Sequence, residues 1–289
     1  MKKIGVVGLG NMGRGMALTL KRGGFEVIGT DAIATTRAAL TAEGVCVRQT
    51  IGEVVAECDT VFLSLPTAAI VEEVIAGPDG IIEHARAGVL IIDTSTSHPE
   101  TTRRMLVKLN AVGMELMDAP VSGGPKGALT GTMAMVIGAS LQNFKRAEPI
   151  LVAMTGKRIH VGEVGAGHVA KIANNLFAAA HLLIAGEVTR MAAKAGVPTD
   201  QLLQGINAGS GRSFVTELNY PTWVLNGKFD SGFTMKLMRK DVRLSQELIQ
   251  ALELDLPLAG KVAELWAKSA ETIEDAEDFN RIVELGTRQ

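Results

Sequence analysis

The feature that most constrains the fold is a glycine pattern between a short apolar strand and a helix. Residues 3–8 (KIGVVG) form an uninterrupted apolar run, which is typical of a strand buried on both faces. The run leads into Gly8-Leu9-Gly10-Asn11-Met12-Gly13, which matches G-x-G-x-x-G, and a helical pattern follows from Met12 to Arg22. In this context the glycines permit a tight turn, close approach of a pyrophosphate, and close helix–strand packing. The segment predicts a dinucleotide-binding turn with the phosphates at a helix N-terminus.

A carboxylate follows the second predicted strand. The apolar residues of Glu26–Asp31 (EVIGTD) end at Asp31, close to the spacing of about 20 residues at which dinucleotide folds place the acid that binds the ribose 2′-hydroxyl. A carboxylate there would repel a 2′-phosphate, and Ala32 and Ile33 supply no cation, so NAD is favoured over NADP. Arg37 is the nearest cation and is interpreted as a surface residue. A purely structural Asp31, as helix cap or turn former, stays open as an alternative.

Strand and helix patterns alternate through the first half of the chain. Further strands are expected at Val45–Arg48, Thr60–Leu65, Val89–Asp93, Glu115–Ala119, Met133–Ile137 and Arg158–Val161, and further helices at Ala34–Glu43, Ala68–Ala76, Pro99–Leu109 and Leu141–Met154. This alternation is typical of a parallel sheet with helices on both faces. We therefore predict the α/β class, with a Rossmann-type, doubly wound NAD-binding domain over residues 1–162.

The second half is expected to be all-helical, as a substrate and oligomerisation domain over residues 163–289. Its helices are predicted at Val169–Ala195, Thr199–Ala208, Thr216–Leu225, Thr234–Leu252, Pro257–Lys268 and Phe279–Leu285. The first of them is long, rich in alanine and apolar nearly all round. A helix of that kind is usually buried, here between domains or against a second subunit.

Composition narrows the function classes. The formal net charge of −2 gives no electrostatic reason to expect nucleic acid or an anionic membrane as partner. The two cysteines, Cys46 and Cys58, cannot form a disulfide framework, and no cysteine–histidine spacing predicts a metal site. The apolar N-terminal run is too short and too glycine-rich for a signal peptide, and no uninterrupted run reaches the ~18 residues of a membrane helix. We expect a soluble, cytoplasmic protein.

Polar side chains recur where the predicted strands end. Thr96 lies in the hydroxyl-rich turn of IIDTSTSHP and could contact the nicotinamide ribose, although a plain N-cap before Pro99 is the simpler interpretation. Ser122-Gly123-Gly124 could expose consecutive N–H groups to a carboxylate, although such a pattern is more often only a turn.

A lysine lies near the start of the long apolar helix. Lys171 and Asn175 are four residues apart and share one face of it. A partly buried lysine there would have a lowered pKa and could exchange a proton with a substrate oxygen, with Asn175 orienting the substrate. His168, one turn earlier, could tune substrate binding, although a helix N-terminal residue without a chemical role is the simpler interpretation.

Four segments together resemble the β-hydroxyacid dehydrogenase family, which includes 3-hydroxyisobutyrate dehydrogenase and tartronate semialdehyde reductase. They are the GLGNMG turn, DAPVSGGPKGA at residues 118–128, GAGHVAKIANN at residues 165–175 and FTMKLMRKD at residues 233–241. They occur in the family's order and span nearly the whole chain. The resemblance implies hydride transfer between NAD and C3 of a small 3-hydroxy acid or its aldehyde acid.

The resemblance also implies roles for particular residues. Lys171 would be the catalytic acid/base, with Ser122, Gly123 and Gly124 as the substrate carboxylate site and Asn175 assisting. The implied cofactor contacts, beyond the glycine turn and Asp31, are Leu65, Pro66, Thr96, Phe233 and Lys240. Asp241 would hold Lys240 or Lys171 in place, and a homodimer or homotetramer is implied.

Alternatives remain open at this stage. Imine reductases resemble the fold but usually carry Asp or Tyr where Lys171 stands, and phosphogluconate dehydrogenases have a histidine where this chain has Asn174. A catalytically silent nucleotide-binding relative would be expected to lose the lysine. Among hydroxy acids the substrate is undecided, with tartronate semialdehyde one specific candidate. Arg212 either binds a second acidic group of a diacid or is an exposed loop residue.

Overall fold

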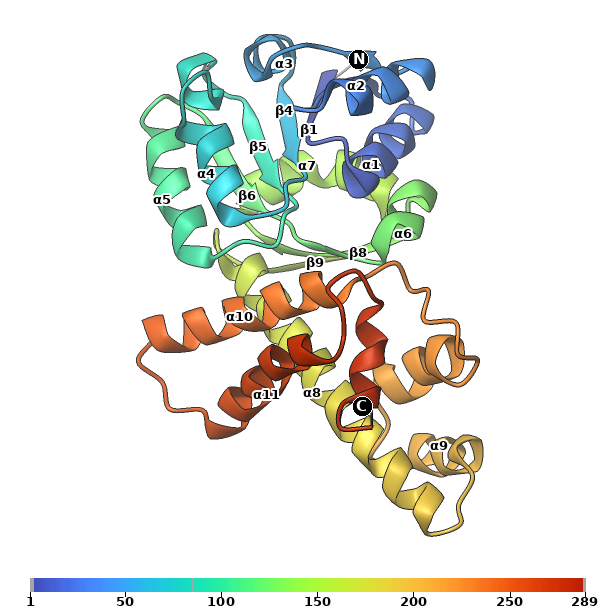
Figure 1. Ribbon diagram of the computed structural model, residues 1–289. Helices are drawn as coiled ribbons and strands as arrows, with labels where there is room; N and C mark the ends of the chain where they lie inside the picture. Colours follow the sequence, from blue (N-terminus) through green and yellow to red (C-terminus); the bar gives the residue numbers. More distant parts are fainter. Residues whose placement is uncertain (1–2, 85, 288–289) are drawn as a thin grey trace. The chain divides into compact units, whose positions relative to one another are not determined.

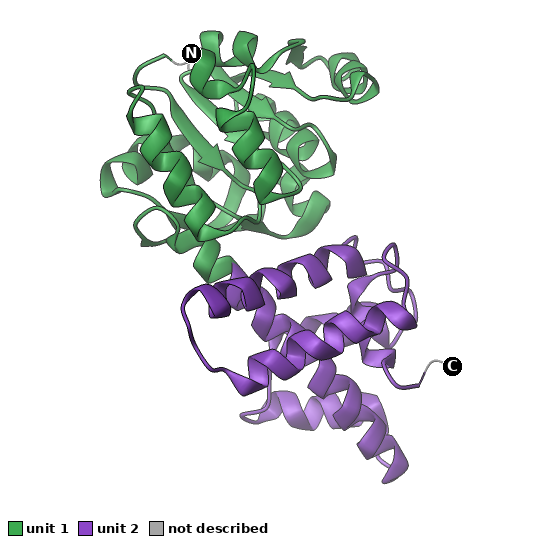
Figure 2. Ribbon diagram, turned by 60° about the vertical axis from the view of Figure 1, so that its left-hand side comes forward, with its two compact units in different colours: residues 1–171 green, residues 172–289 purple. Residues whose placement is uncertain are grey.

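The computed structural model describes residues 3–84 and 86–287, which form two compact units, residues 1–171 and 172–289 (Figure 2). Met1 and Lys2, the start of the segment weighed as a leader, lie outside the described residues. The predicted fold class is confirmed: a parallel-rich sheet with flanking helices comes first and helices follow. The predicted domain boundary after residue 162 stays a prediction, and the two units divide a few residues later, within one helix.

A nine-stranded sheet forms the centre of the first unit, with strands in the order β3-β2-β1-β4-β5-β6-β8-β7 and β9 paired to β8 (Figure 1). The strands are β1 Lys3–Val7, β2 Glu26–Thr30, β3 Cys46–Val47, β4 Thr60–Leu63, β5 Leu90–Asp93, β6 Glu115–Asp118, β7 Val121–Ser122, β8 Met133–Gly138 and β9 Thr155–Gly162. The first six pair in parallel, and β8 runs antiparallel to β6 and β7. The order 3-2-1-4-5-6 is that of dinucleotide-binding folds, whose ligands bind at the carboxyl ends of the strands.

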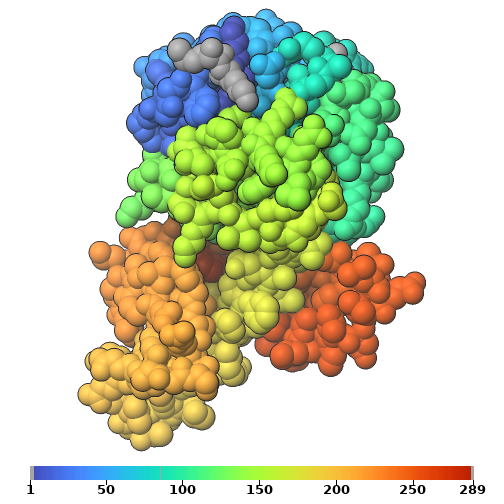
Figure 3. Space-filling model, turned by 180° about the vertical axis from the view of Figure 1, so that it is seen from behind, coloured from blue at the N-terminus to red at the C-terminus, as the bar shows by residue number. Residues whose placement is uncertain are grey.

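Helices cover both faces of this sheet. They are α1 Asn11–Arg22, α2 Ala34–Ala42, α3 Ile51–Glu57, α4 Ala68–Ala76, η1 Ile81–His84, α5 Pro99–Asn110, α6 Gly124–Thr130 and α7 Leu141–Met154. Buried side chains of α1, α2, α6 and α7 pack with one face of the sheet, and those of α3, α4 and α5 pack with the other. Two apolar layers therefore enclose the strands, as the uninterrupted apolar runs predict. Figure 3 views the surface formed by α7 and β9, in yellow-green.

The second unit is helical. Its elements are the greater part of α8 (Ala166–Lys194), α9 Thr199–Ala208, η2 Val215–Val224, α10 Met235–Ala251, α11 Pro257–Lys268, η3 Ser269–Glu271 and η4 Phe279–Glu284. Trp266 is fully buried in its core and donates from Nε1 to the carbonyl oxygen of Ala179, over 3.2 Å. By length and composition α8 could cross a membrane. Core helices of globular proteins can have the same length and composition, and α8 contacts Trp266 in the core of this unit.

Several elements differ from the sequence-based predictions. The short strand β7, helices α3 and α6 and the 3-10 helices η1 and η3 were not predicted. The helix expected over 216–225 is a π-helix, η2, and the one expected over 279–285 is a 3-10 helix, η4. Pro221 lies inside η2. A proline removes one helical donor and its ring clashes with the carbonyl four residues earlier, and the wider π winding displaces that carbonyl. The remaining boundaries agree within a few residues.

Candidate active site

The glycine turn joins β1 to α1, and two of its glycines are required by packing. Gly8 has φ +89°, and a Cβ there would lie 2.3 Å from the carbonyl oxygen of Ser64. A Cβ on Gly13 would lie 1.8 Å from the carbonyl oxygen of Gly8. At Gly10, the N-cap of α1, a Cβ would meet no described protein atom within 4 Å. Protein packing therefore does not explain Gly10. A glycine there fits the close approach of a pyrophosphate to the helix N-terminus.

Asp31 ties this turn to the loop after β2. Its Oδ2 accepts a hydrogen bond from the Leu9 N–H over 2.7 Å, and its Oδ1 accepts one from the Ile33 N–H over 2.8 Å. Asp31 therefore shapes the turn, which was the structural alternative. A carboxylate oxygen can accept a second hydrogen bond, so ribose hydroxyls can still bind Asp31. Both roles are compatible with the same geometry.

Arg37 is more than a surface residue. It is half-buried, and its Nη1 donates to the carbonyl oxygens of Asp31, over 2.5 Å, and Ala32, over 3.1 Å. The guanidinium therefore holds the backbone that carries the Asp31 carboxylate. Sequence periodicity placed Arg37 in a helix but gave no sign that its side chain turns back to the preceding loop.

The loops that follow β4 and β5 lie together. The Leu65 N–H donates to Ser95 Oγ over 3.0 Å, so the predicted cofactor contacts Leu65 and Thr96 are on joined loops. Thr96 is half-buried and Pro66 is exposed. The helix α5 is capped by His98, whose side chain accepts from the Glu100 N–H. Thr96 is therefore not the N-cap, which removes its simpler interpretation.

Lys171 meets Ser122 at the carboxyl side of the sheet. The Lys171 Nζ donates to Ser122 Oγ over 3.0 Å, and Lys171 is only 8% exposed. Ser122 ends β7, and the next two residues adopt positive φ angles, +119° at Gly123 and +59° at Gly124, before α6 begins. The chain thus places an amine, a hydroxyl and a glycine turn in one region of the first unit.

A buried carboxylate that sequence reasoning missed positions the start of α8. The fully buried Asp118, at the end of β6, accepts hydrogen bonds from the N–H groups of Gly165 (2.6 Å) and His168 (2.7 Å). A Cβ on Gly167 would lie 2.8 Å from Asp118 Oδ2, so only glycine lets the turn wrap this closely. Burial raises the pKa of the Asp118 carboxyl, and the two N–H donors and nearby His168 oppose that rise.

Within the second unit, Asp241 joins two of the predicted site residues. Its Oδ2 accepts a hydrogen bond from Asn175 Nδ2 over 2.5 Å, and its Oδ1 lies 3.2 Å from Lys240 Nζ. Asp241 therefore forms an ion pair with Lys240, one of the two lysines that it was expected to hold. Phe233 packs edge-on against Phe279, with ring centroids 5.2 Å apart.

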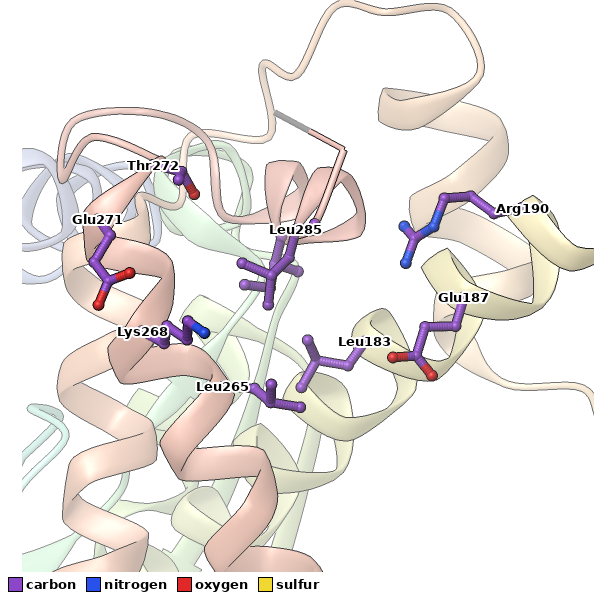
Figure 4. A pocket seen from close by; sticks show the side chains of 10 residues that line it. Leu183, Glu187, Arg190, Leu265, Lys268, Glu271, Thr272 and Leu285 are labelled. Carbon is purple, nitrogen blue, oxygen red and sulfur yellow. The ribbon is translucent and has the colours of Figure 1, made fainter. Parts of the chain in front are cut away.

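A cavity of about 380 Å³ also lies in the second unit (Figure 4). Glu187 and Arg190 of α8 lie on one side of it, and Lys268 and Glu271 on the other. None of the predicted site residues lines it. Across residues 3–84 and 86–287, no three His, Cys, Asp or Glu side chains gather as metal ligands.

Strand order, glycine turn and Asp31 together define a dinucleotide-binding protein of the Rossmann type. Residues 3–162 match the family described as the NAD-binding domain of 6-phosphogluconate dehydrogenase. Residues 165–285 match the family described as the NAD-binding of NADP-dependent 3-hydroxyisobutyrate dehydrogenase.

Similar proteins cover almost the whole chain. A 2-(hydroxymethyl)glutarate dehydrogenase of Eubacterium barkeri is 34% identical over 98% of this chain and 94% of its own. A probable 3-hydroxyisobutyrate dehydrogenase of Mycobacterium tuberculosis is 34% identical over 98% of this chain and 97% of its own. A solved structure of a Mycobacterium tuberculosis 3-hydroxyisobutyrate dehydrogenase with L-serine, also 34% identical, has a TM-score of 0.92, with 98% of each chain covered. The chain belongs to the β-hydroxyacid dehydrogenase family of NAD-dependent oxidoreductases, which confirms the resemblance and the predicted cofactor and class of small carboxylate-bearing substrate.

Proposed function

We propose that the protein oxidises the C3 hydroxyl of a small 3-hydroxy acid with NAD, or reduces the matching aldehyde acid, with Lys171 as acid/base. The observation that carries this proposal is the contact between Lys171 Nζ and Ser122 Oγ, 3.0 Å long, at a lysine that is 8% exposed. A lysine so buried lies where its proton can pass to or from a bound oxygen rather than to bulk water.

Each side chain has a defined task in the proposed reaction. Ser122 Oγ and the amides of Gly123 and Gly124 bind the substrate carboxylate. The neutral amine of Lys171 accepts the proton of the substrate hydroxyl during oxidation, and the ammonium returns it during reduction. Asn175, one helical turn further along α8 and fixed by Asp241, orients the substrate. The nicotinamide of bound NAD supplies the hydride acceptor.

The glycine turn, Asp31, Leu65, Pro66, Thr96, Phe233 and Lys240 form the proposed cofactor contacts. The open approach at Gly10 and the carboxylate at Asp31 support this assignment for the first unit. The Asp31 carboxylate also favours NAD over NADP, because it repels a 2′-phosphate.

The substrate class follows from a chemical feature that three names share. 2-(Hydroxymethyl)glutarate, 3-hydroxyisobutyrate and L-serine all carry a hydroxymethyl group on the carbon next to a carboxylate. The three differ only in the group on that carbon. We propose a 2-substituted 3-hydroxypropanoate as substrate, which places the primary hydroxyl at a fixed distance from the bound carboxylate.

The test is NADH formation at 340 nm with these three compounds, and NADH consumption with tartronate semialdehyde. Lys171→Ala is expected to lower kcat by about 10²–10⁴-fold, the usual contribution of a positioned proton acceptor. Lys194→Ala, at the exposed end of the same helix, is the matched control. Turnover that survives Lys171→Ala would contradict the mechanism, and NAD binding without any turnover would favour a catalytically silent relative.

Substitution of Arg212 tests whether the substrate is a diacid or a smaller monoacid. It is exposed in the segment of residues 209–214 that follows α9. An arginine can bind a second carboxylate on the substrate through two parallel hydrogen bonds. Arg212→Gln is therefore expected to weaken turnover of 2-(hydroxymethyl)glutarate selectively if that diacid is the substrate, and to leave 3-hydroxyisobutyrate unaffected.

We propose further that the protein is a homodimer or homotetramer. The exposed apolar side chains Phe177, Ile184 and Met191 recur every seven residues along α8, a spacing that aligns them on one face for pairing with a second copy. Light scattering is expected to give a mass at least twice 30.5 kDa. Ile184→Glu should shift that mass towards the monomer, and a monomeric wild type would contradict the proposal.

A cytoplasmic location is also proposed. Cys46 is exposed and both cysteines are free, which suits a reducing compartment. Cell fractionation tests this, since recovery of the protein with an extracytoplasmic fraction would contradict it.

A further inference from the structure

The imidazole of His168 is fully buried and is bonded through both ring nitrogens. Its Nε2 lies 3.0 Å from the carbonyl oxygen of Ser95, and its Nδ1 lies 2.8 Å from Thr102 Oγ1. Because a carbonyl oxygen only accepts, Nε2 carries the hydrogen and donates it. His168 thereby links α8 to the loop after β5 and to α5, two contacts that its place at the helix N-terminus did not predict.

Two buried carboxylates lie near the ring, beyond hydrogen-bond distance of its nitrogens. Asp93 Oδ2 lies 3.8 Å from Nε2, and Asp118 Oδ2 lies 3.8 Å from Nδ1. Asp118 also accepts from the backbone N–H of His168. Both the backbone and the side chain of this residue are therefore held, so the first turn of α8 has one defined position relative to the strand ends.

The same contacts lead to the loops proposed to bind the cofactor. Ser95, whose carbonyl oxygen binds His168, accepts the Leu65 N–H at its own hydroxyl. Lys171 is three residues after His168 and lies on a neighbouring position of the same helix face. One imidazole thus stands between the loops that carry Leu65 and Thr96 and the turn of helix that carries Lys171.

We propose that His168 is a positioning residue that sets the placement of Lys171 relative to the cofactor loops. This inference rests on the proposed function. In that reaction Lys171 would take the proton of the substrate hydroxyl, and bound NAD would supply the hydride acceptor for the carbon that carries this hydroxyl. The two acceptors must hold fixed places relative to one another, and a displacement of about 1 Å costs about 10²-fold in rate.

Two substitutions at His168 separate the loss of its hydrogen bond to Ser95 from the loss of the imidazole ring itself. His168→Gln places an amide nitrogen near the location of Nε2 and keeps a donor for the Ser95 carbonyl oxygen. His168→Asn reaches only the location of Nδ1 and loses that donor. We expect kcat to fall by up to about 10²-fold in the Asn variant, with KM and NADH affinity nearly unchanged, and to recover most of its value in the Gln variant.

A second readout requires no turnover. Lys171 is labelled with acetic anhydride, and the extent is read by mass spectrometry against the exposed Lys108 as internal reference. His168→Asn is expected to raise the relative labelling rate of Lys171 several-fold, while His168→Gln keeps the wild-type rate. Increased labelling in a protein that turns over none of the hydroxy acids would support the positioning role and contradict only the proposed substrate.

Thr102→Val provides an independent variant should His168→Asn fail to fold. Valine keeps the shape of threonine but removes the hydroxyl that binds Nδ1, so Lys171 labelling should rise in the same direction, by a smaller factor. Folding is checked by thermal denaturation. Wild-type labelling of Lys171 in folded Thr102→Val, or equal kcat and labelling in the Asn and Gln variants of His168, would overturn the proposal.

Discussion

Lys171 Nζ donates a hydrogen bond to Ser122 Oγ over 3.0 Å, although 49 residues separate them in the chain. The serine comes from the short strand β7 and the lysine from the first turns of α8. An ammonium group loses much of its hydration when it is buried to 8% exposure, and the serine oxygen replaces part of it. The pair therefore places an amine and a hydroxyl side by side in one region of the first unit.

Removal of the Ser122 hydroxyl tests its proposed role in carboxylate binding. A hydrogen bond to a charged group contributes about 1.5–3 kcal/mol, so Ser122→Ala is expected to raise KM for the hydroxy acid by about 10–100-fold. Steady-state kinetics with the best of the panel compounds measures this, and NADH fluorescence titration should show unchanged cofactor affinity. Ser122→Thr, which keeps a hydroxyl, is the control. An unchanged KM in the alanine variant would exclude Ser122 from the carboxylate site.

The glycine turn predicts opposite outcomes for two alanine substitutions. In Gly13→Ala the Cβ would lie 1.8 Å from Gly8 O, a backbone atom that cannot move without displacing the turn. Overpacking of this kind costs about 1–3 kcal/mol, so the melting temperature should fall. In Gly10→Ala the Cβ meets no described protein atom within 4 Å, so stability should stay near that of wild type while NADH affinity falls.

Calorimetry and NADH titration on the same two proteins give both quantities. If Gly10→Ala bound NADH as tightly as wild type, the pyrophosphate would not approach this glycine. If Gly13→Ala melted at the wild-type temperature, the turn would be more deformable than its contacts indicate.

Local sequence signals were sufficient for the turn and most of the helices. The strand before Gly8 and the helix after it give opposite hydrophobic periods within a few residues, and that contrast is visible without tertiary structure. Helix α3 carries a different local signal, a capping box at its start. Thr50 accepts from the Glu53 N–H and the Glu53 carboxylate accepts from the Thr50 N–H, a reciprocal cap that the letters T-I-G-E already encode.

The network around His168 could not be predicted in this way. Asp118 and Ser95 lie 50 and 73 residues from His168 in the chain, so no local period relates them. Their meeting depends on strand order, because β5 and β6 are neighbours whose carboxyl ends face the start of α8. A fully buried histidine beside two carboxylates has no compositional signature, and only the folded chain shows that it is bonded at both nitrogens.

Cofactor choice is expected to depend on Asp31 and Arg37 together. Asp31→Ala removes the carboxylate that repels a 2′-phosphate and leaves the Arg37 guanidinium beside the same loop. The ratio of NADPH to NADH affinity should therefore rise by about ten-fold or more, the effect of about 1.4 kcal/mol. Fluorescence titration with both cofactors measures it.

Two further variants make the result specific. Asp31→Asn keeps an acceptor for the Leu9 N–H, so it separates the charge from the shape of the turn. Asp31→Ala combined with Arg37→Ala should lose the gain in NADPH affinity. A single variant that binds both cofactors less well, in equal proportion, would show that Asp31 acts only on the turn.

The two cysteines are expected to differ in reactivity and in their effect on alkaline stability. Cys58 is fully buried, and burial raises the pKa of its thiol from 9.0 to about 12, whereas Cys46 is exposed. At pH 8 a disulfide reagent should therefore modify one thiol in the native protein and both in urea. Between about pH 9 and 12 the unfolded chain releases the Cys58 proton and the folded chain keeps it, so this group lowers the free energy of unfolding as pH rises, by up to about 1.4 kcal/mol per pH unit. Cys58→Ala lacks this thiol, so its free energy of unfolding should fall less steeply at alkaline pH in denaturant titrations. Burial also raises the pKa of Tyr220, but Tyr220 titrates in both proteins and its effect cancels in the comparison. Equal declines would show that Cys58 ionises as readily in the folded chain as in the unfolded one.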